Sequence, residues 1–308
     1  MTSWETAGEL VDRPCPLCGP SIPSTVVAEA NVDVDRLDDF AFASRKRPEY
    51  MHHRLVRCES CGLVYASPAP LADDLGQAYS EAAYDSADES SYAAATYAAA
   101  LADVVAALPA DGGALDIGTG DGAFLTRLRE MGVDDVTGIE PSAAAADAAP
   151  PEVRPRIRLG PFRPDDLEPG GFRLVTCFQT LEHLPEPLTT CRAAYRLLSA
   201  GGALAVVCHD RRAAVNRLLG RRSPIYDIEH LQLFCPRSVR LLLERSGLNR
   251  VEVRPLRNRY PLRYWLRLAP VPDPLKERLL AAAAARWGSV AVSLPVGNVL
   301  AVGFRPGP

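Results

Sequence analysis

The chain from residue 114 onward alternates between short apolar runs and amphipathic stretches. Runs of four to seven apolar residues predict buried strands, and longer stretches with apolar residues three or four positions apart predict helices. Strands are expected at 114–117, 135–139, 156–159, 172–178 and 203–208, and helices at 123–131, from 142, at 187–200 and at 238–247. Strands and helices that alternate in this way predict a doubly wound α/β sheet.

Two later apolar strands, VEVRPL at 251–256 and VLAVGF at 299–304, enclose a long insertion at 256–296. Together they predict that the sheet ends with an added antiparallel strand. The insertion mixes arginine, aromatic and proline residues and is expected near the active face. There Tyr260, Tyr264 and Trp265 would either line an apolar substrate pocket or pack a helical hairpin on the sheet.

Three glycines follow the first strand expected in the α/β part, at 114–117, within the sequence LDIGTGDGAFL at 115–125. In a doubly wound sheet the ligand lies beyond the carboxyl ends of the strands. The second strand ends in Glu140, whose carboxylate is placed to accept hydrogen bonds from the hydroxyls of a ribose. The spacing also satisfies the dinucleotide fingerprint GxGxxA, but no basic residue follows to neutralise a pyrophosphate. Asp116, two residues before the first glycine, is placed instead to bind an ammonium group.

The N-terminal part carries CPLC at 15–18 and CESC at 58–61, each followed by glycine. Two such pairs supply four thiolates, the ligand set of a structural Zn²⁺ site that leaves no position open for water. The predicted ligands are Cys15, Cys18, Cys58 and Cys61. His52 and His53 lie nearby in the sequence and are interpreted as ordinary polar residues of the approaching strand.

These patterns divide the chain into three parts. Residues 1–72 are predicted to form a zinc ribbon, and residues 73–110, which are rich in alanine, a helical linker or lid. Residues 111–308 are predicted to form the α/β domain, with the insertion at 256–296.

The charge balance excludes some functions. The 308 residues carry 34 Lys and Arg against 38 Asp and Glu, for a net charge of −4. Such a balance gives no electrostatic footprint for nucleic acid. No apolar run approaches the roughly 18 residues of a membrane span, and the polar N-terminus is unlike a signal peptide. We therefore expect a cytoplasmic protein with a small-molecule substrate; the sequence does not set its oligomeric state.

The successive motifs LDIGTGDGAFL, GIEPS, FRLVTCFQTLEHLPEP and LLSAGGALAV resemble those of class I S-adenosylmethionine-dependent methyltransferases. CPLCG, VRCESCGLVYASPAP and NRLLGRRSPIYDIEHLQLF further resemble the bacterial subfamily with an N-terminal zinc ribbon, which includes C-methyltransferases of sugars and natural products. The resemblance implies a Rossmann-like methyltransferase fold and S-adenosylmethionine as the cofactor. It also implies the cofactor-binding residues Asp116, Gly118, Thr119, Gly120, Glu140, Phe162, Phe178 and Gln179. Many relatives have an acidic residue after the third strand to bind adenine, where this chain has GPFRPDDL at 160–167.

Two Glu–His pairs are candidates for the chemistry, because a carbon or hydroxyl nucleophile must lose a proton. Glu182 and His183 follow the fourth strand, and Glu229 and His230 follow the fifth. Tyr226 lies beside the second pair, and the group resembles the Tyr/Glu/His cluster of the C-methylating relatives. An alternative is that Glu182, His183 and Glu229 bind Mg²⁺, as in some quinone O-methyltransferases.

The sequence leaves three functions open. The first is methylation of carbon, or of oxygen, on a small molecule of secondary metabolism. The second is a cyclase of the same fold, in which the base deprotonates a substrate joined to S-adenosylmethionine and S-adenosylhomocysteine leaves as the ring closes. The third is a zinc-ribbon module that recruits a macromolecular partner, which the neutral charge disfavours.

Overall fold

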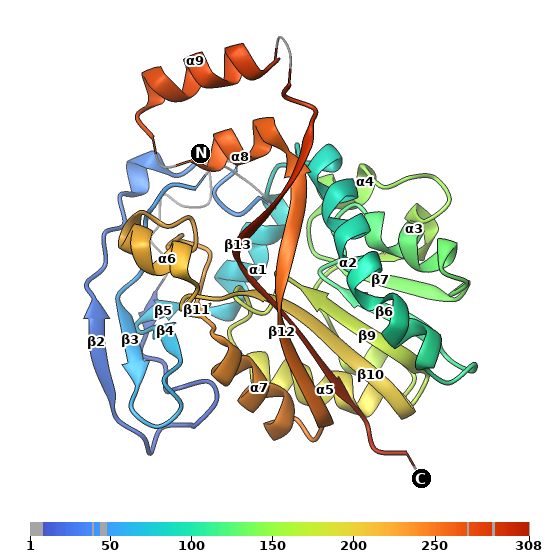
Figure 1. Ribbon diagram of the computed structural model, residues 1–308. Coiled ribbons are helices and arrows are strands. Elements are labelled where there is room, and N and C mark those ends of the chain that lie inside the picture. The colour runs from blue at the N-terminus through green and yellow to red at the C-terminus, as the bar shows by residue number, and fades with distance from the viewer. Residues whose placement is uncertain (1–8, 39, 44–47, 270, 285–286, 308) are drawn as a thin grey trace.

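A seven-stranded mixed sheet with helices on both faces forms the larger part of the molecule, and a smaller sheet packs at its side (Figure 1). The computed structural model describes residues 9–38, 40–43, 48–269, 271–284 and 287–307. Within these ranges, no helix has both the length and the apolar character that crossing a membrane requires.

The strands of the large sheet lie in the order β12-β13-β10-β9-β6-β7-β8. Strands β10, β9, β6, β7 and β8 are parallel, whereas β13 runs antiparallel to both β10 and β12. This arrangement confirms the predicted antiparallel last strand. The strands are β6 (Gly113–Ile117), β7 (Val136–Glu140), β8 (Ile157–Leu159), β9 (Phe172–Phe178), β10 (Leu198–His209), β12 (Asn249–Pro261) and β13 (Ala291–Phe304).

Helices cover both faces of this sheet because its strands are apolar on both sides. On one face α5 (Pro187–Leu197) and α7 (Pro236–Arg245) share a core with the sheet. On the other face α2 (Ala87–Ala107) and α3 (Ala123–Glu130) do so. Proline at the first position of α5 and α7 fits the start of a helix, where the missing N–H is not needed. The short helix α4 (Ala143–Asp147) begins at Ser142, whose hydroxyl accepts a hydrogen bond from the backbone N–H of Ala145.

The smaller sheet belongs mainly to the N-terminal part. Its strands are β2 (Ser24–Ala28), β3 (Leu55–Cys58) and β4 (Val64–Ala66), with β11 (Gln232–Leu233) at the edge beside β4. In the sequence, β1 (Leu10–Val11) precedes β2 and β5 (Ala69–Pro70) follows β4, and these two short strands pair with each other in a separate two-stranded sheet. Because β11 comes from the loop that carries His230, the α/β part of the chain completes the sheet of the N-terminal part.

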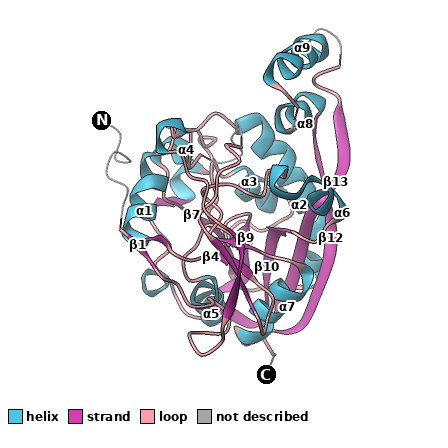
Figure 2. Cartoon of the chain, turned by 90° about the vertical axis from the view of Figure 1, so that its left-hand side faces the viewer, coloured by secondary structure: helices cyan, strands magenta, loops and turns pink. Residues whose placement is uncertain are grey.

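Two regions differ in detail from the predicted elements. The alanine-rich linker forms two helices, α1 (Ala72–Glu81) and α2, with a break at 82–86. The insertion is shorter than expected, because β12 and β13 continue pairing as far as Pro261 and Ala291. Between them lie α8 (Leu262–Leu268) and α9 (Asp273–Ala284), which project beyond the sheet (Figures 1 and 2). The remaining helix, α6 (Ala214–Leu219), precedes the His230 loop.

Candidate active site

A cavity of about 530 Å³ lies at the carboxyl ends of β6, β7, β9 and β10. Its floor is the glycine loop after β6, and its walls come from segments far apart in the chain. Phe42 of the N-terminal part, Tyr79 of α1, Tyr97 of α2 and Tyr264 of α8 all line it. The volume falls in the range of pockets that enclose small molecules, about 300–1,000 Å³.

The cavity brings together all the residues predicted to bind the cofactor. Each of them lines it: Asp116, Gly118, Thr119, Gly120, Glu140, Phe162, Phe178 and Gln179. Their roles as cofactor contacts are predictions. Tyr264 of the insertion also lines the cavity, as predicted for a pocket wall. Tyr260 and Trp265 instead pack in the core around α2 and α8.

The glycine loop is held in a left-handed conformation that only glycine adopts readily. Gly118, Gly120 and Gly122 have φ angles of 75°, 61° and 72°. The backbone N–H groups of Gly118 and Thr119 both donate to the carbonyl of Ile139, which ties the loop to the end of β7. A Cβ on Gly118 would clash with the side chain of Thr180, whereas a Cβ on Gly120 would meet no atom within 4 Å.

Alanine at these two positions is therefore expected to have different effects. Both Gly118→Ala and Gly120→Ala incur the cost of a positive φ, about 1–2 kcal/mol, but only Gly118→Ala also forces Thr180 to move. We expect Gly118→Ala to be the more destabilising of the two by at least about 1 kcal/mol. Gly120→Ala should fold but lose affinity for S-adenosylhomocysteine, because the new methyl group enters the cavity. Urea unfolding and calorimetry would measure the two effects, and equal stability of the variants would contradict this account.

Two buried carboxylates lie beside the loop. Asp116 accepts a hydrogen bond of 2.6 Å from the hydroxyl of Thr176. Glu140 accepts hydrogen bonds from the backbone N–H groups of Gly120 at 2.7 Å and of Ser142 at 2.9 Å. Burial, more than any neighbouring charge, raises the pKa of Glu140 to about 7.

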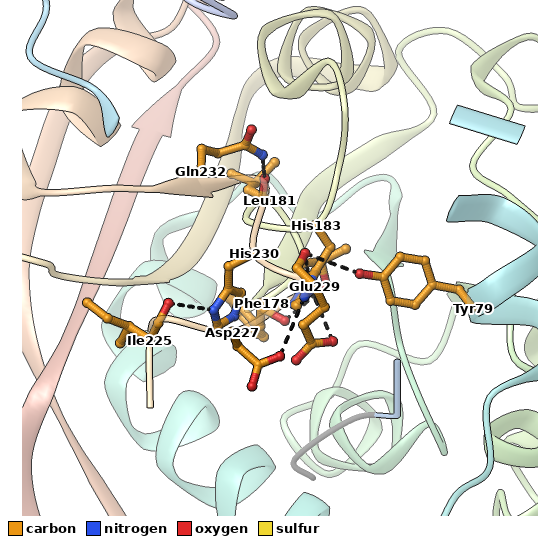
Figure 3. A network of polar contacts seen from close by, with 10 residues as sticks. Tyr79, Phe178, Leu181, His183, Ile225, Asp227, Glu229, His230 and Gln232 are labelled. Carbon is orange, nitrogen blue, oxygen red and sulfur yellow. Dashed lines mark hydrogen bonds and ion pairs between the residues drawn. The ribbon is translucent and has the colours of Figure 1, made fainter. Parts of the chain in front are cut away.

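Glu229 and His230, the second Glu–His pair, lie beside His183 of the first pair (Figure 3). All three residues line the cavity. His183, Glu229 and His230 place a ring nitrogen or a carboxylate oxygen each within 4.8 Å of one another. Nδ1 of His183 lies 3.5 Å from a carboxylate oxygen of Glu229, and the rings of His183 and His230 are 5.0 Å apart. Nδ1 of His230 lies 2.9 Å from the carbonyl oxygen of Ile225. Since that carbonyl can only accept, it fixes the proton on Nδ1 and leaves the lone pair of neutral His230 on Nε2.

Glu182 and Tyr226 are not part of this group. Glu182 is fully buried and accepts a 2.6 Å hydrogen bond from the backbone N–H of His209, so its carboxylate does not line the cavity. The set of Glu182, His183 and Glu229 considered for Mg²⁺ is therefore not assembled. Tyr226 packs edge-on against the ring of His52, on the other side of its loop, and does not line the cavity either.

Three residues that the sequence interpretation missed line the cavity beside these histidines. The hydroxyl of Tyr79 is 3.5 Å from the carbonyl oxygen of Glu229, and its pKa is raised well above the usual value by burial and then by the charge of Glu229. Asp227 lies in the His230 loop. His209 ends β10, and its Nδ1 is 2.8 Å from Oδ1 of Asn298 on β13. His209 was detectable, because polar residues at the carboxyl ends of parallel strands face the ligand site.

The four cysteines of the N-terminal part meet in a separate cluster. The sulfur atoms of Cys15, Cys18, Cys58 and Cys61 all lie within 4.8 Å of one another, and those of Cys15 and Cys61 are 3.6 Å apart. Zn–S bonds of about 2.3 Å in a tetrahedron require sulfur atoms about 3.8 Å apart, so the residues fit the predicted zinc ion. Gly19 and Gly62 adopt φ angles of 77° and 74°, as expected for glycines that close the two turns. His52 and His53 are not members of the cluster.

The sheet with its single antiparallel strand, the glycine loop after β6 and the acidic end of β7 define a class of protein, the S-adenosylmethionine-dependent methyltransferases. Residues 90–253, just over half of the 308-residue chain, match the family profile described as "Methyltransferase domain". The chain belongs to this family.

Curated relatives match part of the chain, and solved structures match more of it at low sequence identity. A ubiquinone biosynthesis O-methyltransferase of Albidiferax ferrireducens is 32% identical over 29% of this chain and 37% of its own length. The chain spans between 37% and 50% of the length of curated relatives that it matches. A solved methyltransferase of Thermotoga maritima, titled a possible histamine N-methyltransferase, is 18% identical over 70% of this chain and 91% of its own, with a TM-score of 0.45. The [4+2]-cyclase SpnF is 20% identical over 78% of this chain and 98% of its own, also with a TM-score of 0.45.

The residues around the glycine loop fit S-adenosylmethionine. The hydroxyl of Thr119 is buried and has no hydrogen-bond partner among the described residues, which suits a ligand that supplies one. The open space above Gly120 leaves room for close approach of a ligand to the backbone. When bound, S-adenosylmethionine supplies an electrophilic methyl group on a positively charged sulfur.

The raised pKa of Glu140 predicts that cofactor binding depends on pH. Only the ionised carboxylate accepts hydrogen bonds from both hydroxyls of a ribose, and protonation competes with binding as the pH falls through about 7. We therefore expect S-adenosylhomocysteine to bind about ten-fold more weakly at pH 6 than at pH 8. Glu140→Gln should bind weakly and without this dependence. Isothermal titration calorimetry would test both statements, and an unchanged slope in Glu140→Gln would show that another group is responsible.

Proposed function

We propose that the protein transfers the methyl group of S-adenosylmethionine to a small molecule, with His230 as the general base. One observation carries this proposal: the glycine loop and the pair of His183 and His230 open into the same cavity. A nucleophile held between them would face the methyl group on one side and a proton acceptor on the other, which is what an in-line transfer needs.

Each member of the histidine group has a defined part in this proposal. His230 donates through Nδ1 to the carbonyl of Ile225, so Nε2 is the ring nitrogen that takes the proton from the nucleophile. The electron pair of the broken bond to hydrogen would then form the bond to the methyl carbon, while the bond between that carbon and sulfur breaks and its electron pair stays on the leaving S-adenosylhomocysteine. The Glu229 carboxylate lies within 4.8 Å of a ring nitrogen of His230 and stabilises the positive charge that the proton brings. His183 contacts the same carboxylate and lies against the ring of His230.

The lining of the cavity supports a substrate whose reacting part is not an anion. Acidic residues line it, and no lysine or arginine is found among the described residues that do so. Such a lining suits the positive charge of the cofactor and a neutral acceptor, and it repels a phosphate. The acidic residues are Asp73, Asp116, Glu140, Asp227 and Glu229.

We propose carbon as the methylated atom and secondary metabolism as the setting. The support for carbon is the histidine group, since removing a proton from carbon requires a strong positioned base, whereas many oxygen nucleophiles require less help. The resemblance of this chain, with its two CxxC pairs, to C-methylating relatives also supports carbon as the methylated atom.

The fit of the four cysteines supports a structural zinc ion. The division at residues 72 and 110 remains a proposal as well.

A labelling experiment would test these proposals. The protein would be incubated with S-adenosylmethionine carrying a ¹³C-methyl group and with an extract of the cells that produce it, separated by ultrafiltration into small molecules and macromolecules. We expect label in the small-molecule fraction, with the ¹³C shift of a carbon-bound methyl group. Label on RNA or protein would favour the recruiting module. The cyclase would be favoured by a ring-closed product that forms from a substrate already joined to the sulfur of the cofactor. S-adenosylhomocysteine would then leave that substrate, and the labelled S-adenosylmethionine would remain unconsumed.

A further inference from the structure

Arg13 links the N-terminal part to both loops that carry the active-site histidines. It lies two residues before Cys15 and is half-buried. Its Nη2 donates to the carbonyl of Pro185 at 2.5 Å and to Oε1 of Gln232 at 3.2 Å. Its Nη1 lies 3.3 Å from the carbonyl oxygen of Leu231 and 3.4 Å from that of Ala66. One guanidinium group therefore spans the loop of His183, the loop of His230 and β4.

Gln232 continues this link between the two loops. Its side chain is fully buried, and its amide nitrogen donates to the carbonyls of Leu181 and Leu184, on either side of His183 (Figure 3 shows the first). Its own backbone N–H and that of Leu231 donate to the carbonyl of Glu182. The position of His183 relative to His230 thus depends on a few hydrogen bonds that converge on Arg13 and Gln232.

The backbone of Arg13 is also fixed in place. Its N–H donates to Oγ of Ser67 at 3.0 Å, and that hydroxyl donates to the carbonyl of Arg13 at 3.1 Å. Ser67 directly follows β4, the strand beside β11. The guanidinium therefore reaches the two histidine loops from a fixed backbone position. Its planar group can donate hydrogen bonds to several acceptors at fixed angles, which a lysine ammonium cannot do.

We propose that Arg13 is a positioning residue of the active site: it acts through Gln232 and the carbonyls of Pro185 and Leu231 to set the distance between His183 and His230. This proposal rests on the proposed function for its catalytic meaning, but the geometry that it claims can be tested separately. On this view the N-terminal part is a structural component of the active site, in addition to covering the cavity.

The test compares Arg13→Met with Arg54→Met. Arg54 is a suitable control because it belongs to the same part of the chain and also bonds Ser67, at 3.1 Å, but the contacts identified for it do not reach either histidine loop. The protein would be labelled with ¹⁵N in its five histidines and studied as the zinc-loaded full chain with S-adenosylhomocysteine bound. Imidazole ¹⁵N shifts report the ring environments of His183 and His230, and those of His52 report the integrity of the N-terminal part.

We expect Arg13→Met to shift the His183 and His230 signals and to raise hydrogen exchange at residues 181–184 and 231–232 about ten-fold or more. Zinc content, affinity for S-adenosylhomocysteine and the His52 signal should stay close to wild type, whereas the His53 signal is expected to respond to the loss of the Arg13 charge, because burial, then His52 and then that charge lower the pKa of His53. Arg13→Lys should not restore the His183 and His230 signals. Arg54→Met should leave them in place.

A second variant keeps the test decisive if Arg13→Met folds poorly. Gln232→Met removes the amide on the catalytic side and leaves Arg13 and the four-cysteine cluster intact, and we expect the same shifts of His183 and His230. If both signals coincide with wild type in either folded variant, or if Arg54→Met moves them equally, Arg13 has only a role in folding. Because these readouts concern ring positions, they hold even if the methyl transfer proposed above is wrong.

Discussion

Replacing His230 by alanine is expected to lower the rate of methyl transfer about 10²–10⁴-fold, the usual contribution of a positioned proton acceptor. The affinity for S-adenosylhomocysteine should change little, because the predicted cofactor contacts lie around residues 116–122 and 140. The wild-type pH–rate profile should rise with pH near neutrality, since an imidazole must be neutral to accept a proton. Measured at saturating S-adenosylmethionine, where the pH-dependent binding attributed to Glu140 does not limit the rate, the His230 variant should lack this rise. Single-turnover kinetics with the acceptor identified by ¹³C labelling would measure both effects.

His183→Ala is the matched comparison for this prediction. His183 lies in the same cavity and contacts His230, but its Nδ1 faces Glu229. We expect a smaller loss of rate, with the pH-dependent rise retained but displaced. If the large loss and the missing rise belong to His183→Ala, the roles of the two histidines are exchanged. If neither variant loses rate, the histidine group is not the base.

Loss of the proposed zinc ion is expected to be strongly destabilising. Structural zinc contributes about 10–16 kcal/mol of apparent binding free energy in small zinc-binding peptides. Three of its four predicted ligands also belong to the core cluster in which α5 and α7 pack on the large sheet. These ligands are Cys15, Cys58 and Cys61. We expect Cys58→Ser to lose the metal and to be destabilised by more than about 4 kcal/mol. Metal analysis should find one zinc per wild-type chain, and chelation should unfold the N-terminal sheet.

Cys235→Ser is the control for this prediction. Cys235 is also buried, but it caps the start of α7 and takes no part in the metal cluster. Serine is a good capping residue, so this variant should keep its zinc and its stability. A folded, stable protein without zinc would contradict the prediction. A second equivalent of metal in the wild type would instead show that His183, Glu229 and His230 hold an ion.

The fold was predictable because local patterns determine it. The glycine loop, the strand ending in Glu140 and the two cysteine pairs each combine a chain conformation with a chemical function in a few consecutive residues. The antiparallel last strand was predictable from two apolar runs. These features depend on neighbours in the sequence, and the structure places them as expected.

The walls of the active site were less predictable because they depend on contacts between distant segments. Tyr79 was not predicted to line the site, since nothing in its helix shows that His183 will lie against its ring. Glu182 was grouped with His183 because they are adjacent, but a backbone turn directs its carboxylate to His209. Arg13 carried no signal at all, as its partners lie up to 219 residues away.

The position of β13 has a consequence for how the protein is made. β13 lies between β10 and β12 in the sheet, although it follows both in the chain. During synthesis, β12 leaves the ribosome without its partner strand and stays unpaired with the sheet until β13 has followed it. Since chains fold as they emerge, starting from the N-terminal end, the nascent protein must carry an exposed edge of β10 through this interval. Tyr264, on the segment between the two strands, reaches its place in the cavity wall only afterwards, so ligand binding during translation is expected to be among the last events.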